Sequence, residues 1–198
     1  MSRDLTAMLA TLRGVLPGGA GITALSPLTT GFSNDTYLVE GLDLILRLPP
    51  AAGAMLDGHG VIAQARIYEA LAAVPGGPPV PEIAFVCEDE SILGAPFFAM
   101  QRVAGESVHD TSLQDWFTEA SDATRGQYCR QWISAFAGLA RLEPLAFLGD
   151  PVAPEDDARM WQAFAASANC PELVALFDRL LAAPAPRSGP RSLVHGDT

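Results

Sequence analysis

The stretch Leu193-Val194-His195-Gly196-Asp197-Thr198 decides how the rest of the sequence is interpreted. Leu193 and Val194 are typical of the end of a short buried strand, and His-Gly-Asp is typical of a tight turn after it. Catalytic groups of open α/β sites lie at the carboxyl ends of strands. The turn either presents Asp197 as a catalytic carboxylate, or is an ordinary turn in which Asp197 caps its own backbone. Because the sequence stops one residue later, we expect a piece of a longer protein.

The composition indicates a folded protein with acidic character. The 198 residues are 49% hydrophobic and 18% charged, which is enough apolar material for one domain or two lobes. The formal net charge is −11, and all 12 basic residues are arginines. Lysine-dependent chemistry is therefore excluded within this sequence. The acidic balance also argues against nucleic acid and anionic membranes as partners.

The cysteines and the N-terminus indicate the compartment. Cys87, Cys129 and Cys170 lie far apart and lack the spacing of metal ligands. They are typical of small core residues in a reducing environment. The sequence shows no signal-peptide pattern, and no apolar run approaches the roughly 18 residues of a membrane span. We therefore expect a cytoplasmic protein.

Hydrophobic periodicity predicts a small sheet followed by helices. The predicted elements are a helix over 3–16, strands over 22–28, 36–40 and 42–48, a helix over 61–73, and strands over 83–87 and 96–103. An irregular polar stretch begins at Ala104, and helical patterns dominate from Ser112 to residue 183. We place a lobe boundary at 103–106, between an N-terminal lobe over 1–103 and a helical lobe over 104–198.

Three apolar stripes at helical spacing run through the second lobe, and they predict helices that face a core. They are Tyr128, Trp132, Phe136 and Leu139, then Met160, Trp161 and Phe164, then Leu173, Leu176 and Leu180. Aromatic stripes of this kind are more often core than cofactor sites.

The segment from Thr29 to Asp35 joins the first two predicted strands and has two interpretations. Gly, Ser, Asn and Asp are common turn residues, so it could be an ordinary hairpin loop. Small side chains also let backbone N–H groups approach phosphate oxygens, with Ser33 and Asn34 as further donors. With only one glycine, the loop by itself favours the hairpin.

Arg47 is unusual because it lies inside the apolar strand Leu44–Leu48. An unpaired buried charge is costly, so this guanidinium needs a partner or a route to solvent. It could belong to an edge strand and reach water, or it could anchor an anion, since guanidinium binds phosphate bidentately. The glycine turn just upstream favours the anchor.

The order of these parts resembles the protein-kinase-like fold, and in particular the aminoglycoside phosphotransferase family. Within that family it resembles the subgroup found alone or associated with acyl-CoA dehydrogenase-like proteins. The stretches that carry the resemblance are Thr30-Gly31-Phe32-Ser33-Asn34, Ile45-Leu46-Arg47-Leu48-Pro49-Pro50, residues 92–100 (ILGAPFFAM) and Leu193-Val194-His195-Gly196-Asp197. The resemblance implies an α+β fold with a small antiparallel-sheet N-lobe and a helical C-lobe. The C-lobe would be incomplete, because the sequence stops after the catalytic-loop aspartate.

The resemblance implies a nucleotide site in the first lobe. The phosphates would be covered by the loop residues Gly31, Phe32, Ser33 and Asn34. Arg47 would bind the α- and β-phosphates, at the position where kinases usually have lysine.

The same resemblance assigns the adenine pocket and the catalytic loop. Met100 would flank the adenine, and the backbones of Gln101 and Val103 would hydrogen-bond its edge. Asp197 would orient or deprotonate a substrate hydroxyl that attacks the γ-phosphate in line. His195 would help to hold the shape of that loop. The implied activity is transfer of the γ-phosphate of ATP to a hydroxyl of a small molecule.

Two departures from the family pattern qualify this expectation. The second helix usually supplies a glutamate to pair with the cation of the third strand, and here that position falls on Gln64. Glu69 could serve instead after a register shift. The family also has a metal-binding Asn five residues after the aspartate and a further metal-binding Asp, so Mg²⁺ ligands are expected only beyond residue 198. This sequence by itself is therefore expected to be inactive.

Two other hypotheses stay open at this stage. The chain could be a kinase-like module that binds a nucleotide or another ligand without catalysis, because Gln64 replaces the acid. It could also be an unrelated α+β hydrolase in which His195 and Asp197 are metal ligands, although no other His or Cys has suitable spacing.

Overall fold

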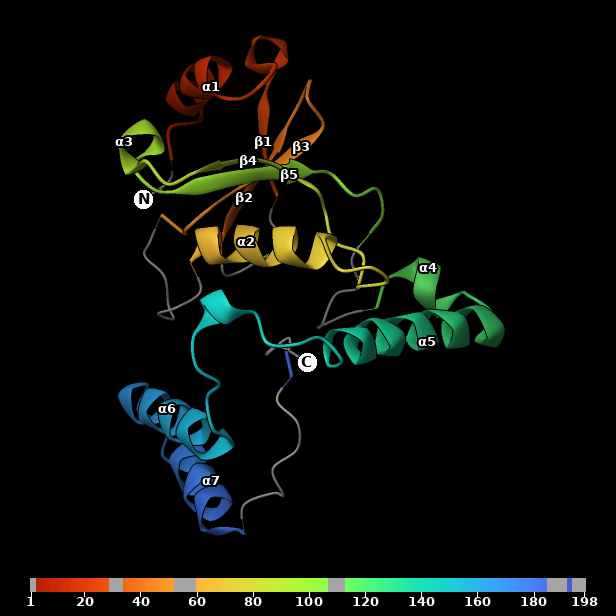
Figure 1. Cartoon of the computed structure of the whole chain (residues 1–198), viewed down its shortest axis with the longest axis vertical. Coiled ribbons are helices and arrows are strands. Elements are labelled where there is room, and N and C mark those ends of the chain that lie inside the picture. Colours follow the sequence, from red (N-terminus) through yellow and green to blue (C-terminus); the bar gives the residue numbers. More distant parts are fainter. Residues whose placement is uncertain (1–2, 29–33, 52–59, 107–112, 185–191, 194–198) are drawn as a thin grey trace. The chain divides into compact units, whose positions relative to one another are not determined.

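The computed structural model describes residues 3–28, 34–51, 60–106, 113–184 and 192–193 (Figure 1). Its centre is an antiparallel sheet of five strands in the order β1-β2-β3-β5-β4. The strands are β1 (Leu25–Leu28), β2 (Asp35–Val39), β3 (Leu44–Leu48), β4 (Ile83–Cys87) and β5 (Phe97–Gln101). Every strand that the sequence predicts is present. β1 is shorter than predicted: it begins at Leu25, and Ile22 forms the C-cap of a 3-10 turn over Gly19–Gly21.

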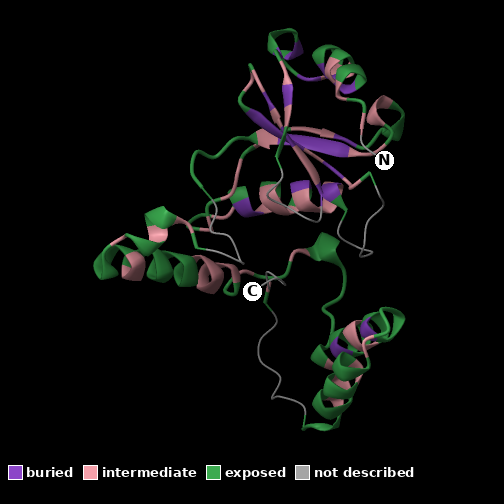
Figure 2. Cartoon of the chain, turned by 180° about the vertical axis from the view of Figure 1, so that it is seen from behind, coloured by how far each residue is buried: buried purple, intermediate pink, exposed green. Residues whose placement is uncertain are grey.

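Helices cover both faces of the sheet (Figures 1 and 2). The helices α1 (Leu5–Val15) and α3 (Glu90–Leu93) lie on one face, and α2 (Val61–Ala72) lies on the other. Asp4 starts α1, because its carboxylate accepts hydrogen bonds from the amides of Thr6 and Ala7.

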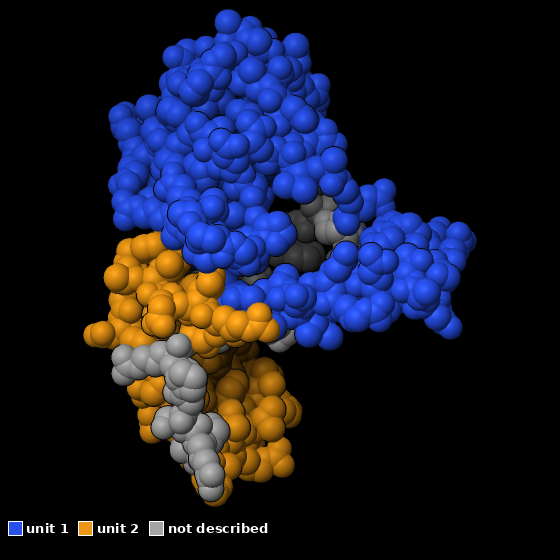
Figure 3. Space-filling view, turned by 45° about the vertical axis from the view of Figure 1, so that its right-hand side comes forward, with its two compact units in different colours: residues 1–139 blue, residues 140–198 orange. Residues whose placement is uncertain are grey.

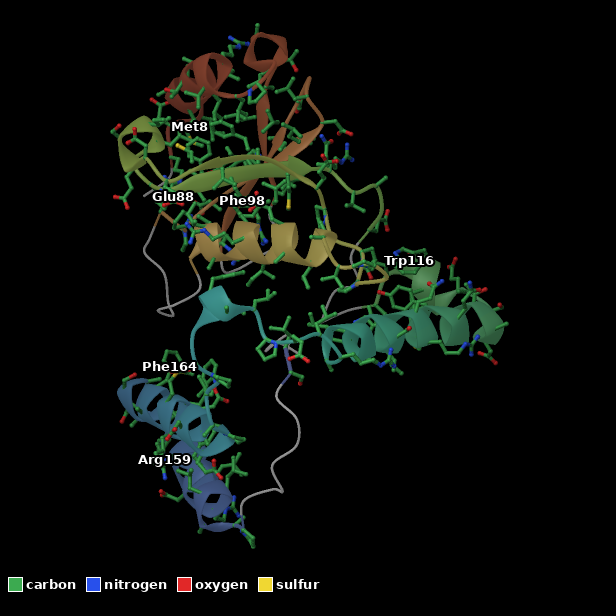
Figure 4. The ribbon with its side chains drawn as sticks, in the orientation of Figure 1. Met8, Glu88, Phe98, Trp116, Arg159 and Phe164 are labelled. Atoms are coloured by element: carbon green, nitrogen blue, oxygen red, sulfur yellow. The ribbon has the colours of Figure 1, made fainter. Side chains whose placement is uncertain are left out.

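Strand alternation divides the core between these two faces. Leu46 and Phe97 point toward α1 and are completely buried, together with Leu12 of that helix. Phe98 lies on the side of the sheet that faces α2 (Figure 4). It is buried together with Val61 and Ala65 of that helix. The sheet therefore has two apolar layers, and the second of them also carries the polar residues described below.

Two connections between the elements depend on particular residues. The β2–β3 turn spans residues 40–43 and depends on Gly41, which has a φ of 93°. A Cβ at Gly41 would lie 2.1 Å from the carbonyl oxygen of Gly21, so only glycine fits there. The acidic stretch 88–91 follows β4 and contains the start of α3, because the Asp89 carboxylate accepts hydrogen bonds from the amide and hydroxyl of Ser91.

The remaining described residues are mostly helical, as predicted. They form α4 (Asp115–Thr118), α5 (Asp122–Leu139), the 3-10 turn Ala146–Leu148, α6 (Pro154–Ser167) and α7 (Pro171–Ala182). Backbone contacts divide the chain into two compact units, Met1–Leu139 and Ala140–Thr198 (Figure 3). Within the second unit, α6 and α7 pack together, and Ala158 and Ala165 of α6 are buried. The division into lobes at 103–106 stays a prediction.

The apolar stripes of α5, α6 and α7 do not form the predicted core. Trp132 is 51% exposed and Leu180 is 56% exposed, and the same holds for much of each stripe (Figure 2). The exposed members include Tyr128, Met160, Phe164, Leu173 and Leu176. Amphipathic spacing shows which face of a helix favours burial, but the described residues do not supply a layer that covers these faces. None of the described helices has the length and hydropathy needed to cross a membrane.

Candidate functional site

Arg47 lies near the middle of the sheet, on the face covered by α2. Its strand, β3, is the third of the five, and Arg47 stands opposite Thr36 of β2 and Phe98 of β5. Because β3 has a neighbour on each side, the interpretation of Arg47 as an edge-strand residue is wrong. The side chain is half-buried beside an apolar cluster, so its guanidinium still needs a hydrogen-bonding or charged partner.

Gln64 is the polar partner of Arg47. It lies in the first turns of α2, and its side-chain oxygen Oε1 accepts a hydrogen bond from Arg47 Nη1 at 3.4 Å. The same oxygen accepts a second hydrogen bond from Asn34 Nδ2 at 3.3 Å. The alternative partner, Glu69, is exposed, and Gln64 holds the position next to Arg47. Both hydrogen bonds are long, so Gln64 orients the guanidinium without holding it tightly.

One nitrogen of Arg47 is left without a partner. Nε is buried and makes no hydrogen bond to any described residue. No ion pair found among the described residues includes Arg47. A buried donor without an acceptor is unfavourable by about 1–3 kcal/mol, and an anionic ligand would remove that cost. A phosphate group therefore fits what the guanidinium lacks.

Asn34 connects this cluster to the predicted phosphate loop. It follows residue 33 directly and is only 9% exposed, the one buried polar residue in the described part of the chain. Its amide donates to Gln64, and its carbonyl oxygen accepts a hydrogen bond from the Thr36 hydroxyl at 3.4 Å. The sequence placed Asn34 over the phosphates, whereas here its side chain is directed to Gln64.

The residues expected around adenine lie at the end of β5. Met100 is on the same sheet face as Arg47 and packs against the cluster of Val61, Ala65 and Phe98. The amide of Gln101 donates to the carbonyl of Glu82 at 2.8 Å, so a contact to adenine would fall to the Gln101 carbonyl.

The next two residues continue this edge. The amide of Arg102 donates to the Asp43 carbonyl at 3.2 Å. Val103 follows it and is 68% exposed. The contact between the backbone of Val103 and the adenine edge stays a prediction.

The other predicted site residues lie outside the described residues. These are Gly31, Phe32 and Ser33 in the loop, and His195 and Asp197 in the final turn. Their proposed roles stay predictions. Among the described residues, no three side chains of the types that bind metals come together.

Sequence reasoning missed one well-formed ionic contact beside the loop. Arg3 Nε donates to Asp35 Oδ2 at 2.8 Å, and Arg3 Nη2 donates to the Pro49 carbonyl at 2.6 Å. The amide of Ala51 donates to the same Asp35 oxygen at 3.1 Å. The contact joins Arg3, two residues before α1, to the start of β2 and the segment after β3. Nothing local could have revealed it, because Arg3 and Asp35 are 32 residues apart.

Burial and this acidic neighbour also act on Tyr37. Desolvation raises the pKa of its phenol above the ordinary value of 10.0, and the nearby charge of Asp35 raises it further, while Arg3 acts in the opposite direction. Tyr37 therefore stays neutral throughout the physiological range.

Comparison with known proteins identifies the family. The sequence profile of the "Phosphotransferase enzyme family" matches residues 24–198, which is most of the chain. The chain belongs to this family. The expected fold is confirmed by solved structures, which show that this member of the family has the protein-kinase-like fold of aminoglycoside phosphotransferases.

Two solved structures illustrate the likeness. One is a putative aminoglycoside phosphotransferase from Ralstonia eutropha JMP134, with a TM-score of 0.63 and 23% identity over 92% of this chain and 54% of that chain. The other is the aminoglycoside phosphotransferase APH(2'')-Ib in its ADP-bound form, with a TM-score of 0.57 and 13% identity over 90% of this chain and 58% of that one. This family member therefore spans little more than half the length of either structure.

Curated relatives confirm the expected subgroup. The chain is 39% identical over 85 residues to acyl-CoA dehydrogenase family member 10 of Mus musculus, a match to 42% of this chain and 8% of that protein. It is 32% identical over 98 residues to acyl-CoA dehydrogenase family member 11 of Gallus gallus, a match to 48% of this chain and 12% of that protein. The phosphotransferase family domain described here thus resembles only a small part of those proteins.

Proposed function

We propose that this chain carries the nucleotide site of an ATP-dependent phosphotransferase that phosphorylates a hydroxyl group of a small molecule. The observation that carries the proposal is Arg47, a half-buried cation on a central strand with an unpartnered buried Nε. Met100, the residue expected beside adenine, lies on the same face of the sheet. Family membership and the ADP-bound structural neighbour support the same ligand class.

The reaction assigns a separate task to each part of the site. Arg47 would hold the α- and β-phosphates, and the loop with Gly31, Phe32 and Ser33 would cover them through backbone amides. The acceptor oxygen would form a bond to the γ-phosphorus while the bond from phosphorus to the β,γ-bridging oxygen breaks. ADP would leave, and Asp197 would take the proton of the hydroxyl.

Magnesium belongs to the proposal as the ion that neutralises phosphate charge during transfer. The family pattern that the sequence resembles has its metal ligands after the position of Asp197, so we assign this ion to no residue of the sequence, and the described residues contribute no metal cluster. From the acidic composition we propose an enzyme without nucleic-acid or membrane partners, and from the scattered cysteines a cytoplasmic one.

A second candidate function is a kinase-like module that binds a nucleotide or another ligand without catalysis. Gln64 favours it, because an amide replaces the acid that usually pairs with the strand cation. The two candidates predict the same binding and differ in turnover.

The test uses the protein encoded by the complete reading frame. Transfer of labelled γ-phosphate from ATP to a panel of hydroxylated small molecules should require Mg²⁺ and should fall by at least about a hundredfold in Asp197→Asn. Arg47→Ala should weaken ATP binding, whereas Arg66→Ala, which removes an exposed arginine of α2, should not. ATP binding without transfer to any acceptor would favour the non-catalytic module. Absence of both would overturn the proposal.

A further inference from the structure

We propose that Gln64 and Asn34 keep Arg47 electrically uncompensated, so that the site binds the fully ionised polyphosphate of a nucleotide without needing a divalent cation to neutralise it first. This inference rests on the proposed function and specifies the ionic form of the ligand. The observation behind it is the convergence of two donors on one oxygen, Gln64 Oε1.

The convergence fixes which end of the Gln64 amide faces Arg47. Guanidinium has only donors, and the Asn34 Nδ2 group is also a donor. Both approach Oε1, at 3.4 and 3.3 Å, so a flipped amide would place an NH₂ group against two other donors. Asn34 therefore acts as a positioning residue, which orients Gln64 so that its oxygen meets Arg47.

The arrangement has a defined charge. A glutamate at position 64 would cancel the charge of Arg47, whereas a glutamine supplies an acceptor and no charge. The next acid in sequence after Asn34 is Asp35, and its carboxylate is already paired with Arg3 at 2.8 Å. Among the described residues the cluster of Asn34, Arg47 and Gln64 thus carries a net charge of +1, with Arg47 Nε still lacking an acceptor.

This charge changes which form of a nucleotide is favoured. Bound magnesium neutralises two negative charges of ATP. A site whose arginine is already paired with a carboxylate attracts those two charges only weakly when the metal is absent. A site with an unpaired guanidinium gains attraction from each of them, and the attraction is strong where water is partly excluded. The cluster should therefore reduce the penalty for binding ATP without metal.

The test compares Gln64→Glu with the natural chain in nucleotide binding. The probe is a ribose-labelled fluorescent ATP (methylanthraniloyl-ATP), titrated into the full chain with EDTA and then with excess Mg²⁺. The natural chain should bind in EDTA within about threefold of its affinity in Mg²⁺. Gln64→Glu should lose at least about tenfold in EDTA and much less in Mg²⁺. Gln127→Glu, which adds the same charge at an exposed position of α5, is the matched control and should behave as the natural chain.

A thermal melt gives a second, independent measurement. The glutamate would form an ion pair with Arg47, so Gln64→Glu should melt at a higher temperature than the natural chain. A lower melting temperature would mean that Oε1 does not face Arg47, and would overturn the inference. Binding by both chains only in the presence of Mg²⁺ would also overturn it. No binding of the probe by either chain in any condition would instead contradict the proposed nucleotide site itself.

Discussion

The sheet and the helices after it both carry apolar patterns that predict burial, but the structure buries only the first of them fully. In the sheet, Leu46 and Phe97 are completely buried between the strands and α1. In α5 and α7, Trp132 and Leu180 are more than half exposed, although their spacing is as regular as that of any core residue. The difference teaches that a sheet with helices on both faces completes its own core, whereas an amphipathic helix specifies only the face that requires a cover.

The largest effect on stability is expected when the same change, leucine to alanine, is made once in the sheet and once in the later helices. Leu46→Ala should lower the free energy of unfolding by about 2–5 kcal/mol, because it leaves a cavity in a closed core. Leu180→Ala on α7 removes the same atoms from an exposed face and should change it by less than about 1 kcal/mol. Thermal and denaturant melts followed by far-UV circular dichroism measure both. Equal losses would mean that the α7 face is covered in solution, and the comparison would fail.

The sequence predicted the strands of the sheet well, and it failed for contacts between residues that lie far apart in the chain. The nearly continuous apolar run Leu44–Leu48 predicted β3, because a strand that is covered on both faces is apolar at almost every position. The same run made Arg47 conspicuous, and its partner Gln64 was predicted from the family resemblance. The contact of Arg3 with Asp35 could not be predicted, since a pair 32 residues apart leaves no periodic signal.

The four-residue helix α3 and the burial of the apolar face of α7 were harder to predict from the sequence. The helix α3 has four residues, too few for a helical period, and it depends on the local cap made by Asp89. The stripe on α7 gave the correct helix but the wrong burial, because its pattern contains no information on what lies against it. Sequence reasoning was reliable where burial is decided within one sheet and its helices.

A smaller effect compares a half-buried ion pair with an exposed one. Arg3→Ala removes hydrogen bonds to Asp35 and to the Pro49 carbonyl and should lower the free energy of unfolding by about 1–2 kcal/mol. Arg66→Ala breaks an exposed pair with Glu88 of similar length and should change it by less than about 0.5 kcal/mol. Urea melts at low and high salt distinguish them, and the Arg66 pair should be the more sensitive to salt. A larger loss for Arg66→Ala than for Arg3→Ala would contradict this ranking.

A weaker effect comes from the buried phenol of Tyr37. Burial, followed by the charge of Asp35, raises its pKa in the folded chain above 10.0. The unfolded chain therefore ionises first as the pH rises, so this contribution to stability is complete below pH 10.0 and is lost as the pH rises through the folded pKa. Tyr37→Phe should thus lose less stability than the natural chain between pH 9 and pH 11. Ultraviolet difference spectra of the two chains should show Tyr37 ionising late, and an ordinary titration would refute its desolvation.

The smallest effect is expected at the exposed cap of α3. The hydrogen bond from the Ser91 hydroxyl, followed by that from the Ser91 amide, lowers the pKa of Asp89 below 3.8. A depressed folded pKa contributes stability above the unfolded value, and that contribution is lost as the pH falls through the folded pKa. Asp89→Ala should therefore melt below the natural chain at neutral pH, and the gap should close as the pH drops below about 3.8. Leu46→Ala carries no titrating group and should keep its gap over the same range, so a gap at Asp89 that is independent of pH would show that the carboxylate does not act as the cap.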